Sequence, residues 1–414
     1  MLYIYLRYPS NKSSNSKLLH YRGFVFRRQG GELWAVCCLM YTVCMNAQMP
    51  HSNWVEIELA AIKNNVRYFS DNSNVNVMAV VKANAYGHGS LPVVETALRA
   101  GASWCGVSRA DEALELRSAG IKCPILVLGF TPTSMIEQLI ANNVSMTGWD
   151  LDYLKDVDVI AQRLCVPARI HLKVDTGMGR VGVHYQDAFH IANYLDGAQG
   201  LLFEGLSTHY ARAFEADFTP TLDQEDCFRN VVGLLAEAGI CPSLVHSSNS
   251  AAIIKKPDLS WNMIRLGIAM YGLDPSEDCK CPVGLRPALT WKAQLSQVKI
   301  VASGTGISYG HNYVTTGQEI IGTVPTGYAD GYRRHGKKIV LIGGKRVPVV
   351  GTVCMDQFMV RLDSVPDAVV GDEVVIIGSQ GLDHISAEEV AFRWSTINYD
   401  VVSSIGSRVP RVYK

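Results

Sequence analysis

The stretch "VMAVVKANAYGHG", residues 77–89, is the first of eight similar units in this chain. Its first five residues are apolar, and they predict a buried strand that ends at Lys82. A lysine at that place loses hydration, so its pKa falls and its amine can act as a nucleophile or a base. The alternative is that Lys82 only ends the strand and extends its ammonium group to water.

Seven further apolar runs follow, separated by amphipathic segments. Residues 108–120 are one such segment, with Ser108 as a candidate N-cap and Gly120 at the expected helix end. Eight strand and helix units with continuously apolar strands predict an α/β fold, a (β/α)₈ barrel of the TIM type over residues 51–284. The predicted strands are residues 77–82, 103–108, 124–129, 144–148, 169–175, 201–207, 243–248 and 262–268.

The pattern changes after residue 284. Apolar and polar residues then alternate with a period of two, which predicts a separate, mostly β domain over residues 285–414. The pair Gly343-Gly344 suits a tight hairpin. One helix interrupts the strands, with Ser386 and Glu389 spaced as a capping box.

Composition excludes several classes of partner. The 414 residues contain 38 Lys and Arg against 38 Asp and Glu, so nothing in the net charge favours nucleic acid or an anionic membrane as partner. The 11 cysteines lack the spacing of metal ligands, so we expect no metal site and reduced thiols in a cytoplasmic protein.

Residues 1–50 are an N-terminal extension. Their apolar run, residues 33–45, is shorter than the roughly 20 residues that span a bilayer. We expect either a disordered extension or sequence upstream of a true start at Met45 or Met49. The alternative is an export signal that is cleaved after Ala47.

Polar residues follow several of the predicted strands, at the end where active sites of such barrels lie. Each alone could be structural, but together they would face one cup. The ends of the seventh and eighth strands usually bind phosphate, and a phosphate group opposite a desolvated lysine implies pyridoxal phosphate held as a Schiff base. The residues are Lys82, Arg180, His209, Asn249, Ser250, Arg265, Gly267 and Ile268.

One motif indicates another cofactor. "GMGRVG", residues 177–182, has the form of a dinucleotide fingerprint, and Glu204 follows at a suitable spacing. However, it falls in the fifth of eight units rather than at the start of a nucleotide-binding half, which argues against a nicotinamide site.

From Trp54 to Lys414 the chain resembles the alanine racemase family. The resemblance rests on nine stretches in family order. It implies a barrel followed by a β domain, joined in a homodimer whose active sites are shared between subunits. The stretches are "AVVKANAYGHG", "LKVDTGMGRVGV", "STHYA", "SSNSAA", "IRLGIAMYGL", "GISYGHNY", "GTVPTGYADGY", "CMDQFMV" and "INYDV".

The resemblance also implies a role for each site residue. Lys82 would bind pyridoxal phosphate and serve as one base, and Tyr309 of the partner subunit would be the second base. Arg265 would contact the pyridine nitrogen, with His209 beside it, and Arg180 with Met355 would hold the substrate carboxylate. Tyr328 would line the access corridor, and Lys173 would carry a carbamate. The phosphate would be bound by Tyr86, Asn249, Ser250, Gly267, Ile268 and Tyr399.

The implied activity is interconversion of L-alanine and D-alanine, which would supply D-alanine for peptidoglycan. Two bases on opposite faces suit this reaction, because a proton leaves one face of Cα and returns on the other. Two alternatives stay open: a racemase for serine or for a broad range of amino acids, and a non-catalytic protein that binds pyridoxal phosphate. Lys173 favours alanine over bulky basic substrates.

Overall fold

The computed structural model describes residues 25–29, 32–36 and 51–414, and the chain divides into two compact units, Met1–His51 and Ser52–Lys414. In the first unit, β1 (Val25–Gln29) and β2 (Glu32–Val36) form an antiparallel ladder. These two strands flank a Gly-Gly pair of the kind that favours hairpins. The interpretation of residues 1–50 as a disordered extension or as sequence upstream of a true start stays a prediction. Met45, Met49 and the export signal fall outside the described residues.

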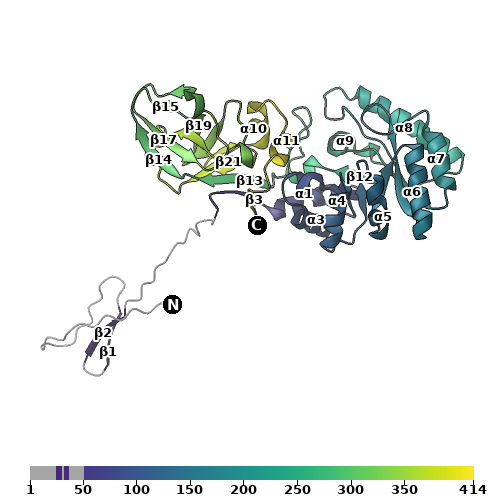
Figure 1. Cartoon of the computed structure of the whole chain (residues 1–414), viewed down its shortest axis with the longest axis horizontal. Helices are drawn as coiled ribbons and strands as arrows, with labels where there is room; N and C mark the ends of the chain where they lie inside the picture. The colour runs from purple at the N-terminus through teal and green to yellow at the C-terminus, as the bar shows by residue number, and fades with distance from the viewer. Residues whose placement is uncertain (1–24, 30–31, 37–50) are drawn as a thin grey trace. The chain divides into compact units, whose positions relative to one another are not determined.

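The second unit contains the predicted barrel (Figure 1). Its strands are parallel in the order β11-β10-β8-β7-β6-β5-β4-β12, and β9 (Val183–His184) pairs with β8. Hydrogen bonds from Asn262 N to Val245 O (3.3 Å) and from Arg265 N to Ser248 O (3.1 Å) link the two end strands and nearly close the barrel. The strands are β4 (Asn76–Val80), β5 (Trp104–Val107), β6 (Ile125–Val127), β7 (Ser145–Gly148), β8 (Ala168–Asp175), β10 (Leu201–Ser207), β11 (Leu244–His246) and β12 (Met263–Leu266).

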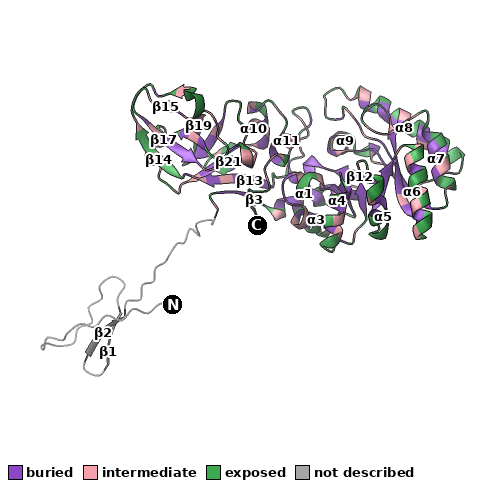
Figure 2. Ribbon diagram, viewed as in Figure 1, coloured by how far each residue is buried: buried purple, intermediate pink, exposed green. Residues whose placement is uncertain are grey.

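Helices surround these strands because each carries one apolar face. In α6 the buried residues Leu154, Val157 and Ala161 recur every three or four positions, the spacing of a helix that packs on one side. Figure 2 shows the barrel strands in the buried colour and exposed residues along the outer helices. The helices are α1 (Leu59–Asp71), α3 (Ser90–Arg99), α4 (Ala110–Ser118), α5 (Thr133–Ala141), α6 (Leu151–Leu164), α7 (Ala188–Gly197), α8 (Thr219–Glu237) and α9 (Ser250–Lys255).

The expected N-cap of α4 is wrong. The helix begins at Ala110, and the Ser108 side chain does not cap it. Instead, the carboxylate of Glu112 accepts hydrogen bonds from the backbone N–H groups of Ser108 (2.7 Å) and Arg109 (3.1 Å). A charged acceptor binds the free amides of a first turn more strongly than a hydroxyl does.

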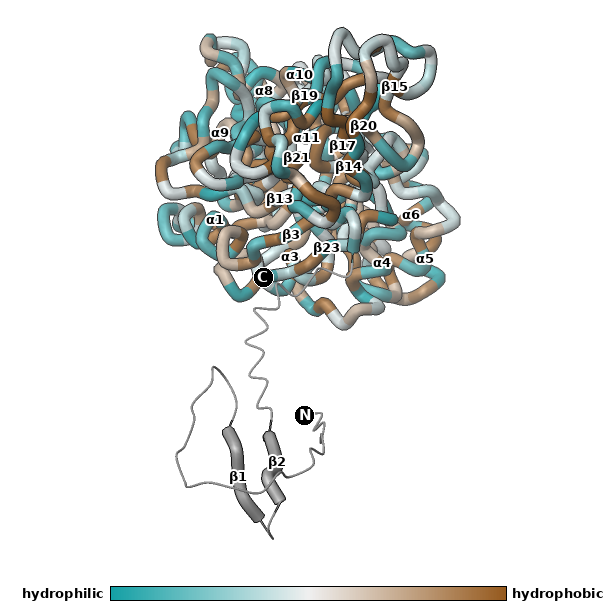
Figure 3. Tube along the Cα trace, turned by 90° about the vertical axis from the view of Figure 1, so that its left-hand side faces the viewer, coloured by the Kyte–Doolittle hydropathy of each residue, from teal (hydrophilic) through white to brown (hydrophobic). Residues whose placement is uncertain are grey.

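The mostly β domain is also confirmed. Its main sheet has the order β14-β17-β20-β19-β18-β21-β13-β3-β23, with β22 (Asp383–Ile385) on β21 and a separate ladder of β15 (Gly306–Ile307) with β16 (Tyr313–Val314). Figure 3 shows hydrophobic residues concentrated around β17 and β20. The main-sheet strands are β3 (Asn53–Ile57), β13 (Leu289–Gln294), β14 (Gln297–Val301), β17 (Glu319–Val324), β18 (Ile339–Ile342), β19 (Lys345–Val350), β20 (Phe358–Arg361), β21 (Glu373–Gln380) and β23 (Arg411–Tyr413).

This sheet corrects one detail of the predicted domains. Residues 53–57, assigned to the barrel from the sequence, form β3 and pair with β13 and β23. Their burial pattern and apolar content do not differ from those of a barrel strand, so only long-range pairing reveals their sheet. The division between residues 284 and 285 stays a prediction.

The hairpin predicted in this domain is confirmed: Gly343-Gly344 joins β18 to β19, with Ile342 paired to Lys345. The predicted capping box is only half formed. The Ser386 hydroxyl accepts the N–H of Glu389 (3.1 Å) at the start of α10 (Ala387–Arg393), but the Glu389 carboxylate pairs with Arg346 and Arg393 instead of the Ser386 backbone. The helix α11 (Asn398–Ser403) follows. Among the described residues, no helix combines the length and apolar character needed to cross a membrane.

Candidate active site

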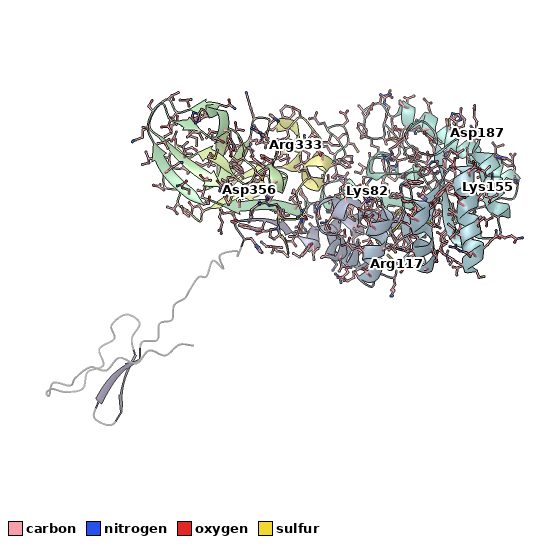
Figure 4. The ribbon with its side chains drawn as sticks, in the orientation of Figure 1. Lys82, Arg117, Lys155, Asp187, Arg333 and Asp356 are labelled. Carbon is pink, nitrogen blue, oxygen red and sulfur yellow. The ribbon has the colours of Figure 1, made fainter. Side chains whose placement is uncertain are left out.

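A cavity of about 630 Å³ lies at the carboxyl ends of the barrel strands. It brings together eleven of the fourteen side chains predicted for the site, and Figure 4 labels one of them, Lys82. No cluster of His, Cys, Asp or Glu that could hold a metal ion occurs in the part of the chain that the structure describes. The eleven residues are Lys82, Tyr86, Lys173, Arg180, His209, Asn249, Ser250, Arg265, Gly267, Ile268 and Tyr399.

The sequence predicted that Lys82 ends a strand, and this prediction is wrong. The strand β4 stops at Val80, and Lys82 opens a short helical turn, α2 (Lys82–Tyr86), of left-handed sense. Ala83, Asn84 and Ala85 each have a φ of 52°. Left-handed helical geometry costs about 1–2 kcal/mol per residue with an L side chain, so the surrounding structure must stabilise this turn.

The surroundings of Lys82 favour its neutral amine. Burial lowers its pKa most, and the positive charges of Arg180 and Arg265 lower it further, while the carboxylate of Glu112 raises it. The structure thus supports the interpretation of Lys82 as a reactive amine rather than as a strand end that extends to water.

A second lysine lines the same cavity as Lys82. Lys173, on β8, is only 9% exposed, and burial together with Arg265 and Arg180 holds its pKa well below the usual value. No acidic side chain lines the cavity among the described residues. The site therefore has an excess of positive charge, which suits an anionic ligand or substrate.

The loop with the fingerprint motif carries Arg180 rather than a nucleotide. Asp175 Oδ1 accepts hydrogen bonds from the backbone N–H groups of Gly177 (2.9 Å), Met178 (2.9 Å) and Gly179 (3.1 Å). These are the amides that a dinucleotide pyrophosphate would need. Since a carboxylate already occupies them, the nicotinamide alternative is wrong, and the motif shapes the loop that presents Arg180.

Arg265 connects two histidines at the floor of the cavity. Its Nη2 lies 3.0 Å from Nδ1 of His209, and its Nη1 lies 2.7 Å from Nδ1 of His246. Because a guanidinium only donates, both Nδ1 atoms must accept, and each neutral imidazole carries its proton on Nε2. Burial and the charge of Arg265 keep the pKa of both histidines well below the usual value, in agreement with neutral rings.

A chain of side chains continues from His246 through the barrel interior. His246 Nε2 lies 2.9 Å from Nδ1 of His171, whose Nε2 lies 3.3 Å from Oε2 of Glu204. Donation therefore runs from Arg265 to His246 and on to His171, whose Nε2 proton lies near the Glu204 carboxylate without a hydrogen bond to it. Glu204 also pairs with Arg169 (2.8 Å). The chain fixes the tautomers of both histidines and compensates part of the positive charge of Arg265.

The far side of the cavity can cradle a phosphate. The Ser250 hydroxyl lies 3.0 Å from Gly267 N, and a Cβ at Gly267 would lie 3.0 Å from the Tyr86 hydroxyl and 3.6 Å from Ser250 Oγ. The Tyr86 and Tyr399 rings lie 6.1 Å apart, and burial raises the pKa of both phenols. Neutral hydroxyl groups around a glycine backbone are suitable donors for a phosphate.

Three predicted residues lie elsewhere. Tyr309, Tyr328 and Met355 belong to the β domain and are 69%, 42% and 53% exposed. They form one patch, because Thr352 Oγ1 donates to Tyr309 O (2.9 Å), Tyr328 N donates to Cys354 O, and Ala329 N donates to Met355 O. Within one chain they do not line the cavity. We call this group the tyrosine patch; Figure 4 labels its neighbour Asp356 in the β domain.

Sequence reasoning missed several residues that support the site. Glu112, Asp175, His171 and His246 all hold a neighbouring functional group in place. The sequence offered a signal for two of them, because His246 and Asp175 lie at the ends of predicted strands. Glu112 and His171 act through contacts between residues far apart in the sequence.

Comparison with known proteins agrees with this geometry. Residues 57–275 match the family model "Alanine racemase, N-terminal domain" and residues 288–413 match "Alanine racemase, C-terminal domain". The alanine racemase of Halothermothrix orenii is 42% identical over 374 residues, which cover 89% of this chain and 99% of that protein.

Solved structures agree as well. The alanine racemase of Bacillus anthracis with bound L-Ala-P has a TM-score of 0.84 at 40% identity, covering 88% of this chain and 95% of that one. A more distant structure, the histidine racemase of Leuconostoc mesenteroides, has a TM-score of 0.81 at 26% identity, over 88% of this chain and 99% of that one.

Proposed function

Since the chain belongs to the alanine racemase family and is an isomerase of that class, we propose that it interconverts L-alanine and D-alanine with pyridoxal 5'-phosphate and two bases. The observation that carries this proposal is the cavity itself. It combines a lysine amine of lowered pKa, a phosphate cradle and the buried Arg265. Stability of the fold alone does not require these three features in one cavity.

The residues fit pyridoxal phosphate. The amine of Lys82 would bind the aldehyde carbon of the cofactor. Arg265 would face the pyridine nitrogen of the cofactor, and His209 would contact the pyridine ring. The phosphate would be held by the hydroxyl groups and backbone around Gly267, with Tyr86, Asn249, Ser250, Ile268 and Tyr399. When bound, this cofactor acidifies the Cα–H of an attached amino acid by delocalising the charge left behind.

Racemisation then needs a proton acceptor on one face of Cα and a donor on the other. Lys82 supplies one of them, because burial and the two arginines favour its neutral amine. The two tyrosines that line the cavity within one chain, Tyr86 and Tyr399, belong to the proposed phosphate cradle. Exposure of the tyrosine patch supports Tyr309 of the partner subunit in that role, with Tyr328 and Met355 beside it, in a homodimer with shared sites.

Arg180 would hold the substrate carboxylate and Lys173 would assist it. A neutral, buried amine reacts with carbon dioxide to give a carbamate and a proton, and the low pKa of Lys173 favours that neutral form. The carbamate would turn a cation beside Arg180 into an anion that pairs with it. An intact-mass measurement of native protein in bicarbonate buffer tests this; full activity with no added carbon dioxide mass would refute it.

We place the enzyme in the cytoplasm, where its product would supply D-alanine for peptidoglycan. All eight cysteines that the structure describes have free thiols, as is usual in a reducing compartment.

Substrate choice is tested with a panel of L-alanine, L-serine, L-lysine and L-histidine, analysed by chiral chromatography after incubation with the protein and pyridoxal phosphate. We expect alanine to dominate. The relative named a histidine racemase makes a broader substrate specificity the second candidate. Turnover of histidine or lysine at a rate comparable to that of alanine would favour this second candidate.

A further inference from the structure

Glu112 contacts the turn that carries Lys82. Its Oε1 accepts a hydrogen bond from the backbone N–H of Ala83 at 2.6 Å, and its Oε2 accepts those of Ser108 and Arg109. One carboxylate on α4 therefore joins two neighbouring loops at the carboxyl ends of β4 and β5. Glu112 does not line the cavity, so it acts on the site through these contacts and through its charge.

The turn needs such an external contact. Ala83, Asn84, Ala85 and Tyr86 all have a φ of 52°. This left-handed conformation is unfavourable for residues that carry a Cβ atom. Internal hydrogen bonds join Ala85 N to Val81 O and Gly87 N to Ala83 O, but Ala83 N has only the Glu112 carboxylate as its hydrogen-bond acceptor. The turn points Lys82 and Tyr86 into the cavity together.

On the basis of the proposed function, we propose that Glu112 is a positioning residue of the racemase. Its carboxylate locks the left-handed turn Lys82–Tyr86, and so aims the amine of Lys82 at the reacting carbon while keeping Tyr86 at the phosphate cradle. It never touches the substrate or the cofactor.

Charge gives the carboxylate a second effect. The charged groups that act on Lys82 are Arg180, Arg265 and Glu112, and only Glu112 raises its pKa. Removing the negative charge while the turn persists lowers the pKa of Lys82 further. Opening the turn to water has the opposite effect, because hydration restores the ammonium form.

The test compares Glu112→Gln with Glu115→Gln, an exposed position on the same helix. Glutamine keeps the size but offers one oxygen where two are used, so either Ala83 or the start of α4 loses its acceptor. In the cofactor-free protein, we expect backbone amides of residues 82–87 to exchange with deuterium about tenfold faster than in the wild type. The control should exchange as the wild type does.

The holoenzyme provides the second readout. We expect kcat for L-alanine to fall about 10- to 100-fold in Glu112→Gln with KM nearly unchanged, because the substrate carboxylate site is intact. Glu112→Asp, which keeps the charge on a shorter side chain, should recover part of the loss.

Either wild-type amide exchange of residues 82–87 or a wild-type kcat in Glu112→Gln would overturn the proposal. Failure of the proposed function is distinguishable, since wild-type protein would then not racemise alanine, whereas amide exchange in the cofactor-free protein would still report on the turn.

Discussion

Nη1 of Arg265 lies 2.7 Å from Nδ1 of His246, which fixes the proton of that imidazole on Nε2. The prediction concerns the protonation of His246, whose pKa burial and Arg265 hold well below the usual value. Nitrogen-15 NMR of the protein at pH 6 should show a neutral ring protonated on Nε2. A doubly protonated ring, or a proton on Nδ1, would contradict the donation chain from Arg265 through His246 to His171.

Replacing Lys173 by methionine should stabilise the cofactor-free protein in carbonate-free buffer. The native pKa of Lys173 is lowered, so between that value and 10.5 the unfolded chain binds more protons and stability rises with pH. The variant lacks this penalty and should gain about 1–3 kcal/mol at pH 7. Its advantage should shrink as the pH approaches 10.5.

Urea unfolding of both proteins at pH 7 and pH 9.5 measures that difference. The exposed Lys122→Met serves as control and should leave stability nearly unchanged at both values. An equal advantage of Lys173→Met at the two pH values would count against a buried cationic cluster.

Gly267→Ala should weaken cofactor binding without unfolding the protein. The added methyl group would lie 3.0 Å from the Tyr86 hydroxyl and 3.6 Å from Ser250 Oγ, inside the proposed phosphate cradle. We expect the affinity for pyridoxal phosphate to fall by about tenfold or more, as measured by absorbance titration. Gly197→Ala, with no atom within 4 Å of the new Cβ, should bind as the wild type does.

Tyr309→Phe should slow proton removal from one enantiomer much more than from the other, by a factor of about 10² or more. NMR of L-alanine and D-alanine incubated separately in deuterium oxide gives both rates of α-proton exchange. The exposed Tyr68→Phe on α1 is the control. Equal losses for the two enantiomers would argue against bases on opposite faces.

The sequence predicted the barrel because continuous apolar strands and regular spacing are local signals. It also predicted which side chains meet at the barrel mouth, since strand ends converge by topology. It failed for the turn after Lys82, because alanine and tyrosine carry Cβ atoms that disfavour positive φ. It failed for Glu112 because its contact with Ala83 spans 29 residues. It also failed for β3, whose pattern fits either sheet.

Mixing two inactive variants tests the central claim, a site shared between subunits, most directly. Lys82→Ala and Tyr309→Ala are each purified, combined in equal amounts, allowed to exchange subunits, and assayed for racemisation of L-alanine. If Lys82 works with Tyr309 of the partner subunit, each mixed dimer regains one intact site, and activity should recover to about a quarter of the wild-type value. If both bases act within one chain, no mixed dimer holds an intact pair, and the mixture would stay as inactive as its components.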